Sequence, residues 1–200
     1  MNFYQNLGCT EEPIVKLDKW LQQATKANVS LPHAMSLATV DEKGCPSARM
    51  VLLKYLSDEG LIFFTDYLSK KGKDISTNQR AAVNFWWAEI DKQVRLEGIC
   101  SKVSTNISEE YFNSRPRDSQ ISASVSYQSS VIENYEDLVN ETTNFANENR
   151  NKKIPRPERW GGFLLKPSNI EFWTNKDNRL HERKLYIFSS GKWVKSLLSP

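Results

Sequence analysis

Apolar residues recur at helical spacing in a stretch near the start of the chain. The members of this stripe lie three or four positions apart and would share one helix face: Ile14, Leu17, Leu21 and Ala24. Just before them, Thr10 offers a hydroxyl that can cap a helix, and Pro13 suits a first helical turn. The pattern therefore predicts an amphipathic helix that begins at Thr10 and ends near Asn28.

From residue 34 onward, apolar and polar residues follow patterns that are typical of strands. The first predicted strands are Ala34–Val40, Ser47–Tyr55, Leu61–Thr65, Ala81–Trp87 and Gln93–Ser104. Acidic turns that end in glycine, at 41–44 and 57–60, join the first three strands as consecutive hairpins. The C-terminal region adds predicted strands at Gly161–Leu165, Ile170–Thr174, Lys184–Ser189 and Trp193–Leu197.

Helices are predicted at a few places between these strands rather than after each one. They are a short basic helix at Lys70–Thr77 and helices at Ser108–Asn113 and Glu133–Asn147; Pro116 disturbs any continuous helix between the last two. This order favours a mainly β fold, an antiparallel barrel or sandwich with peripheral helices, over a doubly wound α/β fold. We expect residues 1–200 to form a single domain with a flexible segment at 1–12, and an exposed connection at Asn149–Pro157.

Composition places the chain among ordinary globular proteins, with 39% hydrophobic and 26% charged residues. A net charge of +3 does not by itself predict binding to nucleic acid. Apolar runs such as Leu61–Phe64 fall short of the roughly 20 residues of a membrane helix, and the N-terminus lacks a signal-peptide pattern. Three widely spaced cysteines predict reduced thiols in a cytoplasmic protein, with no zinc pattern.

Two sets of cations and hydroxyls are candidates for binding an anion. Arg49 and Lys54 flank an otherwise apolar predicted strand, whose ends could simply lie at the solvent boundary. Tyr111, Arg115 and Ser119 recur every four residues and would share one helix face if helical geometry persisted. A guanidinium between two hydroxyls suits a phosphate monoester, although an ordinary solvated helix face has the same spacing.

A third set lies near the C-terminus, after Trp173. Arg179, His181 and Arg183 alternate, which predicts one face of an extended segment. Two arginines beside a histidine repel one another unless an anionic or electron-rich group lies among them. His181 is therefore a better functional candidate than His33. No cluster has the spacing of metal ligands or of a catalytic triad, so we expect no metal site.

Seven short strings, taken together, resemble one known family. They are Arg-Met-Val-Leu-Leu-Lys at 49–54, Phe-Phe-Thr at 63–65, Tyr-Phe-Asn-Ser-Arg-Pro-Arg-Asp-Ser-Gln-Ile at 111–121, Gln-Ser-Ser at 128–130, Trp-Gly-Gly-Phe at 160–163, Ile-Glu-Phe-Trp at 170–173 and Arg-Leu-His-Glu-Arg at 179–183. In this order and spacing they resemble pyridoxamine 5'-phosphate oxidase, from about Leu17 to Pro200. The resemblance implies an antiparallel FMN-binding split β-barrel that forms a homodimer with FMN in two clefts at the subunit interface.

The resemblance also implies site residues. Arg49 and Lys71 would hold the FMN phosphate, with Lys70 beside them. The flavin would be lined by Met50, Val51, Leu52, Leu53, Lys54, Phe64 and Thr65, with further contacts, some from the partner subunit, by Gln93, Gln128, Ser129, Trp173 and Arg183. The substrate phosphate would be bound by Lys54, Tyr111, Arg115 and Ser119. The substrate ring would be held by Arg179, Leu180 and His181, of which the first and last are the candidate catalytic residues.

The implied reaction is FMN-dependent oxidation of pyridoxamine 5'-phosphate and pyridoxine 5'-phosphate to pyridoxal 5'-phosphate, with oxygen as electron acceptor and hydrogen peroxide as product. Alternatives are another flavin split-barrel oxidase, such as one acting on a phenazine precursor, and a non-catalytic carrier of flavin or pyridoxal phosphate. A small nucleic-acid-binding barrel would use the same aromatic and basic residues. The ordered strings argue against the last of these, so we expect neither nucleic acid nor membrane as a partner.

Overall fold

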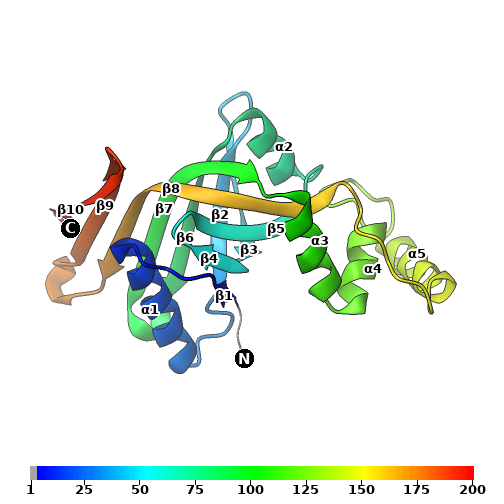
Figure 1. Cartoon of the computed structure of the whole chain (residues 1–200), viewed down its shortest axis with the longest axis horizontal. Coiled ribbons are helices and arrows are strands. Elements are labelled where there is room, and N and C mark those ends of the chain that lie inside the picture. The colour runs from blue at the N-terminus through cyan, green and yellow to red at the C-terminus, as the bar shows by residue number, and fades with distance from the viewer. Residues whose placement is uncertain (1–3) are drawn as a thin grey trace.

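A ten-stranded sheet organises the computed structural model, which describes residues 4–200 (Figure 1). The strand order is β1-β4-β5-β8-β7-β6-β2-β3, and β9 extends from β8 and β10 from β9. Every pairing is antiparallel except the short parallel pair of β1 and β4. The strands are β1 (Gln5–Asn6), β2 (Ala34–Val40), β3 (Pro46–Leu52), β4 (Tyr55–Ser57), β5 (Gly60–Asp66), β6 (Arg80–Trp87), β7 (Lys92–Lys102), β8 (Trp160–Thr174), β9 (Glu182–Ser189) and β10 (Lys192–Leu198).

Strand β8 is continuous, whereas the sequence predicted two separate strands in this region. Its first part pairs with β5, its last part pairs with β9, and β7 runs beside both parts. Pro167 and Ser168 interrupt the apolar pattern at a point where the β7–β8 register shifts between Glu97 and Gly98. Pro167 is paired opposite Gly98, and Ser168 is the extra residue of a bulge. Strands tolerate proline at bulges, so the strand continues past the interruption.

Five helices accompany the sheet in the described part of the chain: α1 (Glu12–Lys26), α2 (Lys70–Thr77), α3 (Thr105–Ser114), α4 (Arg117–Val125) and α5 (Tyr135–Glu148). The limits predicted for α2 are confirmed, and α4 is a helix that the sequence did not predict. Short 3-10 turns lie at Ala88–Ile90 and Asp177–Arg179. In Figure 1, α3, α4 and α5 gather at the end of the molecule opposite β9 and β10. No helix within residues 4–200 is long and apolar enough to cross a membrane.

The first helix begins two residues later than predicted, and Thr10 is not its cap. Glu11 occupies the N-cap position without a side-chain hydrogen bond. Thr10 instead donates its hydroxyl to Asp58 Oδ2 at 2.6 Å, and its backbone N–H also binds that carboxylate. Residues 1–3 of the segment expected to be flexible lie outside the described residues. Gln5 and Asn6 pair with β4 in the structure.

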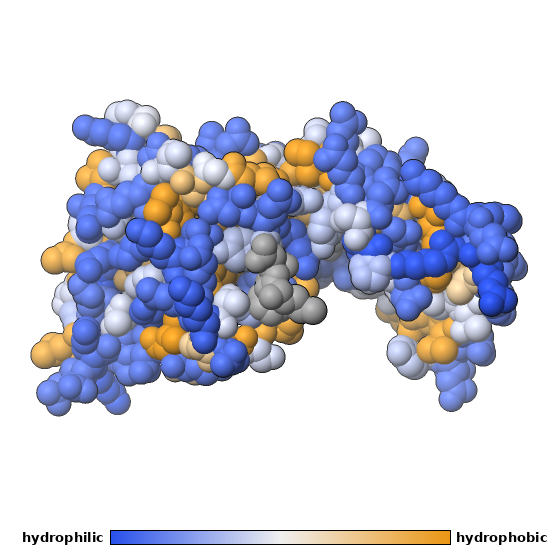
Figure 2. Space-filling view, turned by 60° about the horizontal axis from the view of Figure 1, so that its bottom comes forward, coloured by the Kyte–Doolittle hydropathy of each residue, from blue (hydrophilic) through white to orange (hydrophobic). Residues whose placement is uncertain are grey.

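Two apolar cores lie on either side of the point where β5 meets β8. The larger core contains the buried face of α1 and the inner side chains of the sheet, together with the fully buried Leu53 between β3 and β4. The smaller core joins Phe112 and Ile121 of the helical end to Trp160 and to Ile154, which is buried within the connection predicted to be exposed. A notch separates the body of the sheet from the helical end in Figure 2. Strands β3 and β5 come into contact, so the sheet curls into a half-barrel beside the smaller core.

Candidate active site

A cavity of about 360 Å³ lies between β3, β5, α2 and the break between α3 and α4. All of its lining residues except Pro116 are ones that the sequence predicted: Met50, Val51, Leu52, Lys54, Phe64, Thr65, Lys71, Tyr111, Arg115, Ser119 and Gln128. Leu53 was also predicted to line the flavin, but its side chain packs in the larger core. We call this cavity the cup.

One end of the cup is formed by Tyr111, Arg115 and Ser119, and they do not share a helix face as predicted. Helix α3 ends at Ser114, Arg115 is extended with φ −72° and ψ 150°, and α4 begins at Arg117. Proline disfavours helical geometry in the residue before it, so Pro116 forces the break. The sharp change of direction, rather than helical periodicity, brings the three side chains to one cavity.

Arg115 has unused hydrogen-bonding capacity inside the protein. Its guanidinium stacks 4.5 Å from the Trp160 ring, and its buried NH1 atom has no hydrogen-bond partner. Burial lowers the pKa of Lys54, and the nearby charge of Arg115 lowers it further. Two cations that face the same cavity with an unsatisfied N–H group favour an anion as the missing partner.

Aromatic rings form a wall beside these cations. The rings of Phe64 and Tyr111 stack with centroids 3.9 Å apart, and the Trp160 ring lies 5.6 Å from Phe64. Burial raises the pKa of Tyr111 to about 12, so its hydroxyl remains protonated at neutral pH. The hydroxyl can therefore donate a hydrogen bond to an anion in the cup.

Lys71 carries the positive charge at the other end of the cup. Its Nζ atom donates to Thr65 Oγ1 at 3.0 Å, Ser69 Oγ at 3.1 Å and Gln128 Oε1 at 2.7 Å. These oxygens carry no net charge. Burial lowers the pKa of Lys71 to about 8, and the charge of Arg49 acts in the same direction. An anion at this end would stabilise the protonated amine.

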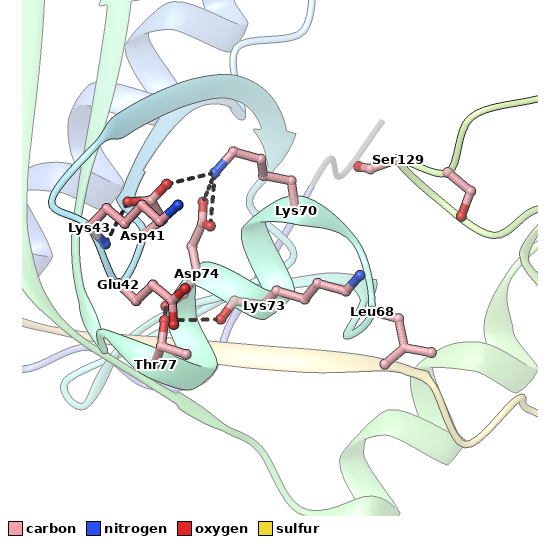
Figure 3. A pocket seen from close by; sticks show the side chains of 10 residues that line it. Asp41, Glu42, Lys43, Leu68, Lys70, Lys73, Asp74, Thr77 and Ser129 are labelled. Atoms are coloured by element: carbon pink, nitrogen blue, oxygen red, sulfur yellow. Dashed lines mark hydrogen bonds and ion pairs between the residues drawn. The ribbon is translucent and has the colours of Figure 1, made fainter.

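Arg49 and Lys70 both lie near the buried carboxylate of Asp74. Arg49 donates to Thr39 Oγ1 at 2.6 Å and lies 3.8 Å from Asp74, while Lys70 pairs with the same carboxylate at 3.0 Å. Lys70 and Ser129 face a second cavity of about 580 Å³, shown in Figure 3. Neighbouring residues in sequence, Lys70 and Lys71, therefore point into adjacent cavities.

The remaining predicted residues form a second cluster near the end of β8. Gln93, Trp173 and Arg183 occupy one row across β7, β8 and β9, so their side chains share a face of the sheet. The His181 ring lies 4.5 Å from the Trp173 ring, and its Nδ1 atom accepts a hydrogen bond from the Lys176 backbone at 3.2 Å. A neutral His181 therefore carries its proton on Nε2.

Arg179 does not alternate with His181 and Arg183 along one strand, as the sequence predicted. It lies in the 3-10 turn with φ +62°, next to Asn178 with φ +55°, and β9 begins only at Glu182. Arg179 and Leu180 are exposed beside the cluster. The turn residues, rather than an extended segment, thus determine where Arg179 projects.

Glu171 is a member of this cluster that sequence reasoning missed. It accepts hydrogen bonds from Arg183, with Nε at 2.8 Å and NH2 at 3.1 Å, and also binds Arg95. Burial pushes the pKa of Glu171 upward, but the hydrogen bonds from both arginines outweigh that effect and hold it below its usual value. A carboxylate within the apolar string Ile-Glu-Phe-Trp was the available signal.

The two groups of residues lie near opposite ends of β8. Gly162 pairs with Phe64 of the cup, whereas Trp173 pairs with Arg183 of the second cluster. Eleven residues separate Gly162 from Trp173, which at about 3.3 Å per residue is roughly 36 Å along the strand. Within one chain, this separation is too large for both groups to touch one flavin-sized ligand.

Comparison with known proteins identifies the family. Residues 21–144 match the family model described as "Pyridoxamine 5'-phosphate oxidase", which covers more than half of the chain. The chain belongs to the pyridoxamine 5'-phosphate oxidase family. Residues 160–200 match a second model, "Pyridoxine 5'-phosphate oxidase C-terminal dimerisation region". A family member from Mannheimia succiniciproducens, named pyridoxine/pyridoxamine 5'-phosphate oxidase, is 45% identical over 96% of this chain and 90% of its own length.

Solved structures agree with this fold. PhzG from Burkholderia lata, in complex with tetrahydrophenazine-1-carboxylic acid, superposes with a TM-score of 0.90 at 29% identity, covering 94% of this chain and 92% of PhzG. An FMN-binding protein from Nostoc punctiforme, related to pyridoxamine 5'-phosphate oxidase, has a TM-score of 0.76 at 15% identity, covering 93% of this chain and 96% of its own. The predicted split β-barrel with peripheral helices is therefore confirmed.

Proposed function

We propose that this chain is an FMN-dependent oxidase that converts pyridoxamine 5'-phosphate and pyridoxine 5'-phosphate to pyridoxal 5'-phosphate. The observation that carries the proposal is the cup, where Arg115 has an unpaired buried N–H group beside Lys54, Tyr111 and Ser119. A phosphate monoester fills this need, because the guanidinium and the hydroxyls donate to its oxygens. Curated relatives named pyridoxine/pyridoxamine 5'-phosphate oxidase support the same assignment.

The residues at the other end of the cup fit the phosphate of FMN. Lys71 is buried among neutral oxygens, which makes it available to an anionic group. Arg49 does not line the cup, since its guanidinium binds Thr39 and lies near Asp74, but its charge acts on Lys71 and lowers the pKa of that amine. The exposed apolar side chains of Met50 and Leu52, on β3, offer a surface for a flat ring system.

A homodimer would complete each site, with the second cluster supplied by the other subunit. The separation along β8 leaves the cup without its predicted ring-binding residues within one chain. The dimerisation region of the family spans residues 160–200, and therefore contains Trp173, His181 and Arg183. Trp86, on the face that carries the second cluster, is 52% exposed and gives an apolar surface to bury on association.

Within such a site, the residues of this chain bind and orient while the cofactor supplies the redox chemistry. When bound, FMN would supply the two-electron chemistry: the substrate would lose a hydride equivalent from C4', and oxygen would take up the electrons as hydrogen peroxide; the amine route would also consume water and release ammonia. Lys54 and Arg115 hold the substrate phosphate. Arg179 and His181 orient the pyridine ring, and Gln93 and Arg183 provide donors for negative charge on the flavin.

The test is anaerobic mixing of the purified protein with pyridoxine 5'-phosphate while the flavin absorbance is recorded. We expect yellow protein whose flavin bands are bleached by substrate and restored by air. A yellow protein that is not bleached would indicate a carrier, and colourless protein that cannot take up FMN would overturn the proposal. Bleaching by a reduced phenazine carboxylic acid, but not by pyridoxine 5'-phosphate, would favour an oxidase similar to PhzG.

A further inference from the structure

An ion pair outside the cup holds together the two segments that meet at Lys71. We infer that Asp66 and Arg159 are positioning residues for the cofactor-phosphate end of the site, an inference that rests on the proposed function. Their side chains are only 3% and 11% exposed, and neither residue lines the cup. The pair joins the end of β5 to the residue just before β8.

Arg159 fixes the segment that carries Gln128. Besides pairing with Asp66, its guanidinium donates to the carbonyl of Ser124 at 2.8 Å and of Ser126 at 3.0 Å. It also stacks 4.1 Å from the Tyr127 ring. These contacts cover the last turn of α4 and the first residues after it. Arg159 therefore sets the position from which Gln128 reaches the cup.

Asp66 fixes the other segment, which carries Lys71. Its Oδ1 atom accepts from the Leu68 backbone at 2.7 Å, and its carbonyl accepts from Ser69 Oγ at 2.6 Å. Ser69 is the N-cap of α2 and accepts from Gly72 N at 3.3 Å. Asp66 thus determines where α2 begins, and Lys71 is the second residue of that helix.

The two segments meet at one oxygen atom inside the cup, Gln128 Oε1. Lys71 Nζ donates to Gln128 Oε1 at 2.7 Å, and Thr65 donates to the same oxygen at 2.7 Å. Beyond Gln128 the chain turns through Ser129, with φ +72°, into residues 129–134, which are exposed. Arg159 is therefore a buried anchor immediately before an exposed loop, and its loss would free Gln128 to move away from Lys71.

The proposed positioning role of Arg159 requires a planar guanidinium with several N–H donors. Arg159 binds a carboxylate and two carbonyls at once, whereas a lysine in its place is a single flexible point charge. Arg159→Lys should keep the positive charge but release the carbonyls of Ser124 and Ser126. The change should disturb the phosphate end of the cofactor site and leave the flavin-ring surface on β3 as it is.

The experiment compares the affinity of the full-length protein for FMN and for riboflavin, which lacks the phosphate, by quenching of flavin fluorescence. Arg159→Lys should weaken FMN binding at least tenfold and change riboflavin binding less than threefold. Asp66→Asn, which preserves shape but removes the carboxylate charge, should show the same selectivity. A general loss of structure would weaken both flavins together.

Arg156→Lys is the matched control. Arg156 has a side chain 9% exposed, pairs with Glu109 at 3.0 Å and binds the Trp160 carbonyl at 2.5 Å, so its hydrogen bonds lie outside residues 124–130. Its substitution should leave the ratio of FMN to riboflavin affinity unchanged. Two results would overturn this inference while leaving the proposed function intact. One is an equal loss of affinity for FMN and riboflavin in Arg159→Lys and Asp66→Asn; the other is the same change in the affinity ratio in Arg156→Lys. Wild-type protein that does not bind FMN would overturn the proposed function itself.

Discussion

Lys71 is an ammonium group whose hydrogen-bond acceptors all carry no net charge, and the charge of Asp66 offsets only part of the effect of burial on its pKa. Its pKa, lowered by burial from 10.5 to about 8, means that the amine is partly neutral in mildly alkaline solution. Between about pH 8 and 10.5 the unfolded chain binds more protons at this site than the folded chain does. The stability contributed there therefore rises with pH across that window. A bound phosphate would reverse the situation by keeping Lys71 protonated.

The first prediction follows from this protonation. FMN binding near pH 8.5 should be accompanied by proton uptake, detected by calorimetry in buffers with different ionisation enthalpies. Lys71→Met should abolish the uptake and weaken FMN binding, because a charge-assisted contact is worth about 1.5–3 kcal/mol. Lys16→Met is the control: the pKa of Lys16 is also lowered to about 8, mainly by burial, but this residue lies 4.4 Å from the Phe172 ring, on α1. Proton uptake that persists without Lys71 would contradict the assignment.

The second prediction concerns Arg115. Arg115→Ala should reduce kcat/KM for pyridoxine 5'-phosphate about tenfold or more, or about 1.4 kcal/mol, and affect unphosphorylated pyridoxine little. The reason is that only pyridoxine 5'-phosphate carries a phosphate that Arg115 can bind. Arg117→Ala provides a control, because this exposed arginine binds the Lys152 carbonyl at 3.1 Å outside the cup. Steady-state kinetics with both substrates decide the point, and equal losses would make Arg115 a structural residue.

Residues that the structure brings to the cup could be predicted from the sequence when they stood in a recognisable string, as Lys54 and Arg115 do. The ion pairs that support the site residues could not. Glu171 and Arg95 lie 76 positions apart in the sequence, and Asp66 and Arg159 lie 93 apart. Such pairs leave no local pattern, because their partners meet only after the sheet has formed.

At the scale of elements, apolar periodicity was sufficient for most strands and for the buried face of α1. It was insufficient where the chain changes direction. Spacing suggested that Tyr111 and Ser119 share a helix, yet they converge across the break at Pro116. The single strand β8 was divided in prediction because its bulge at Ser168 resembles a turn when only the sequence is considered. The convergence of Tyr111 and Ser119 and the continuity of β8 both depend on contacts between distant segments, which local spacing does not reveal.

The third prediction tests a close approach at the start of β8. A Cβ atom on Gly161 would lie 2.1 Å from Tyr67 Oη and 2.8 Å from Ser108 Oγ, so Gly161→Ala should destabilise the fold. We expect a loss of about 1–3 kcal/mol in the free energy of unfolding, measured by urea denaturation. Adding Tyr67→Phe, which removes the nearest atom, should restore part of that loss. If Gly161→Ala costs the same free energy of unfolding in the Tyr67→Phe background as in the wild type, the contact with the Tyr67 hydroxyl is not the cause of the loss.

At the scale of the whole molecule, the cup has the candidate phosphate-binding residues but no candidate ring-binding residues, and the second cluster has the reverse. A second copy of the chain supplies the missing residues if the copies are related by a two-fold axis, since both sites are then completed together. Each active site would combine Arg115 of one subunit with the partner subunit's His181. The proposed enzyme would therefore be an obligate dimer with two equivalent sites.

The fourth prediction uses mixed dimers. Arg115→Ala and His181→Ala should each be poorly active alone. When equal amounts of the two variant subunits associate at random, about a quarter of the wild-type activity should return. Half of the dimers are then hybrids, and each hybrid has one intact site out of two. Activity assays of co-expressed, differently tagged subunits provide the measurement, with singly expressed variants as controls. Hybrids without activity would indicate that both residues serve a site within one chain.

Strand β8 has a consequence for how the chain can change over evolution. Its early residues border one catalytic centre of the proposed dimer and its late residues border the other. Inserting or deleting a single residue between Gly162 and Trp173 would turn Trp173 to the opposite face of the sheet. A change of two residues would preserve the face but displace the row by roughly 7 Å. Substitutions at the exposed positions of this stretch, such as Lys166 and Ser168, leave both centres aligned, so these positions can vary while the length of the stretch is held constant.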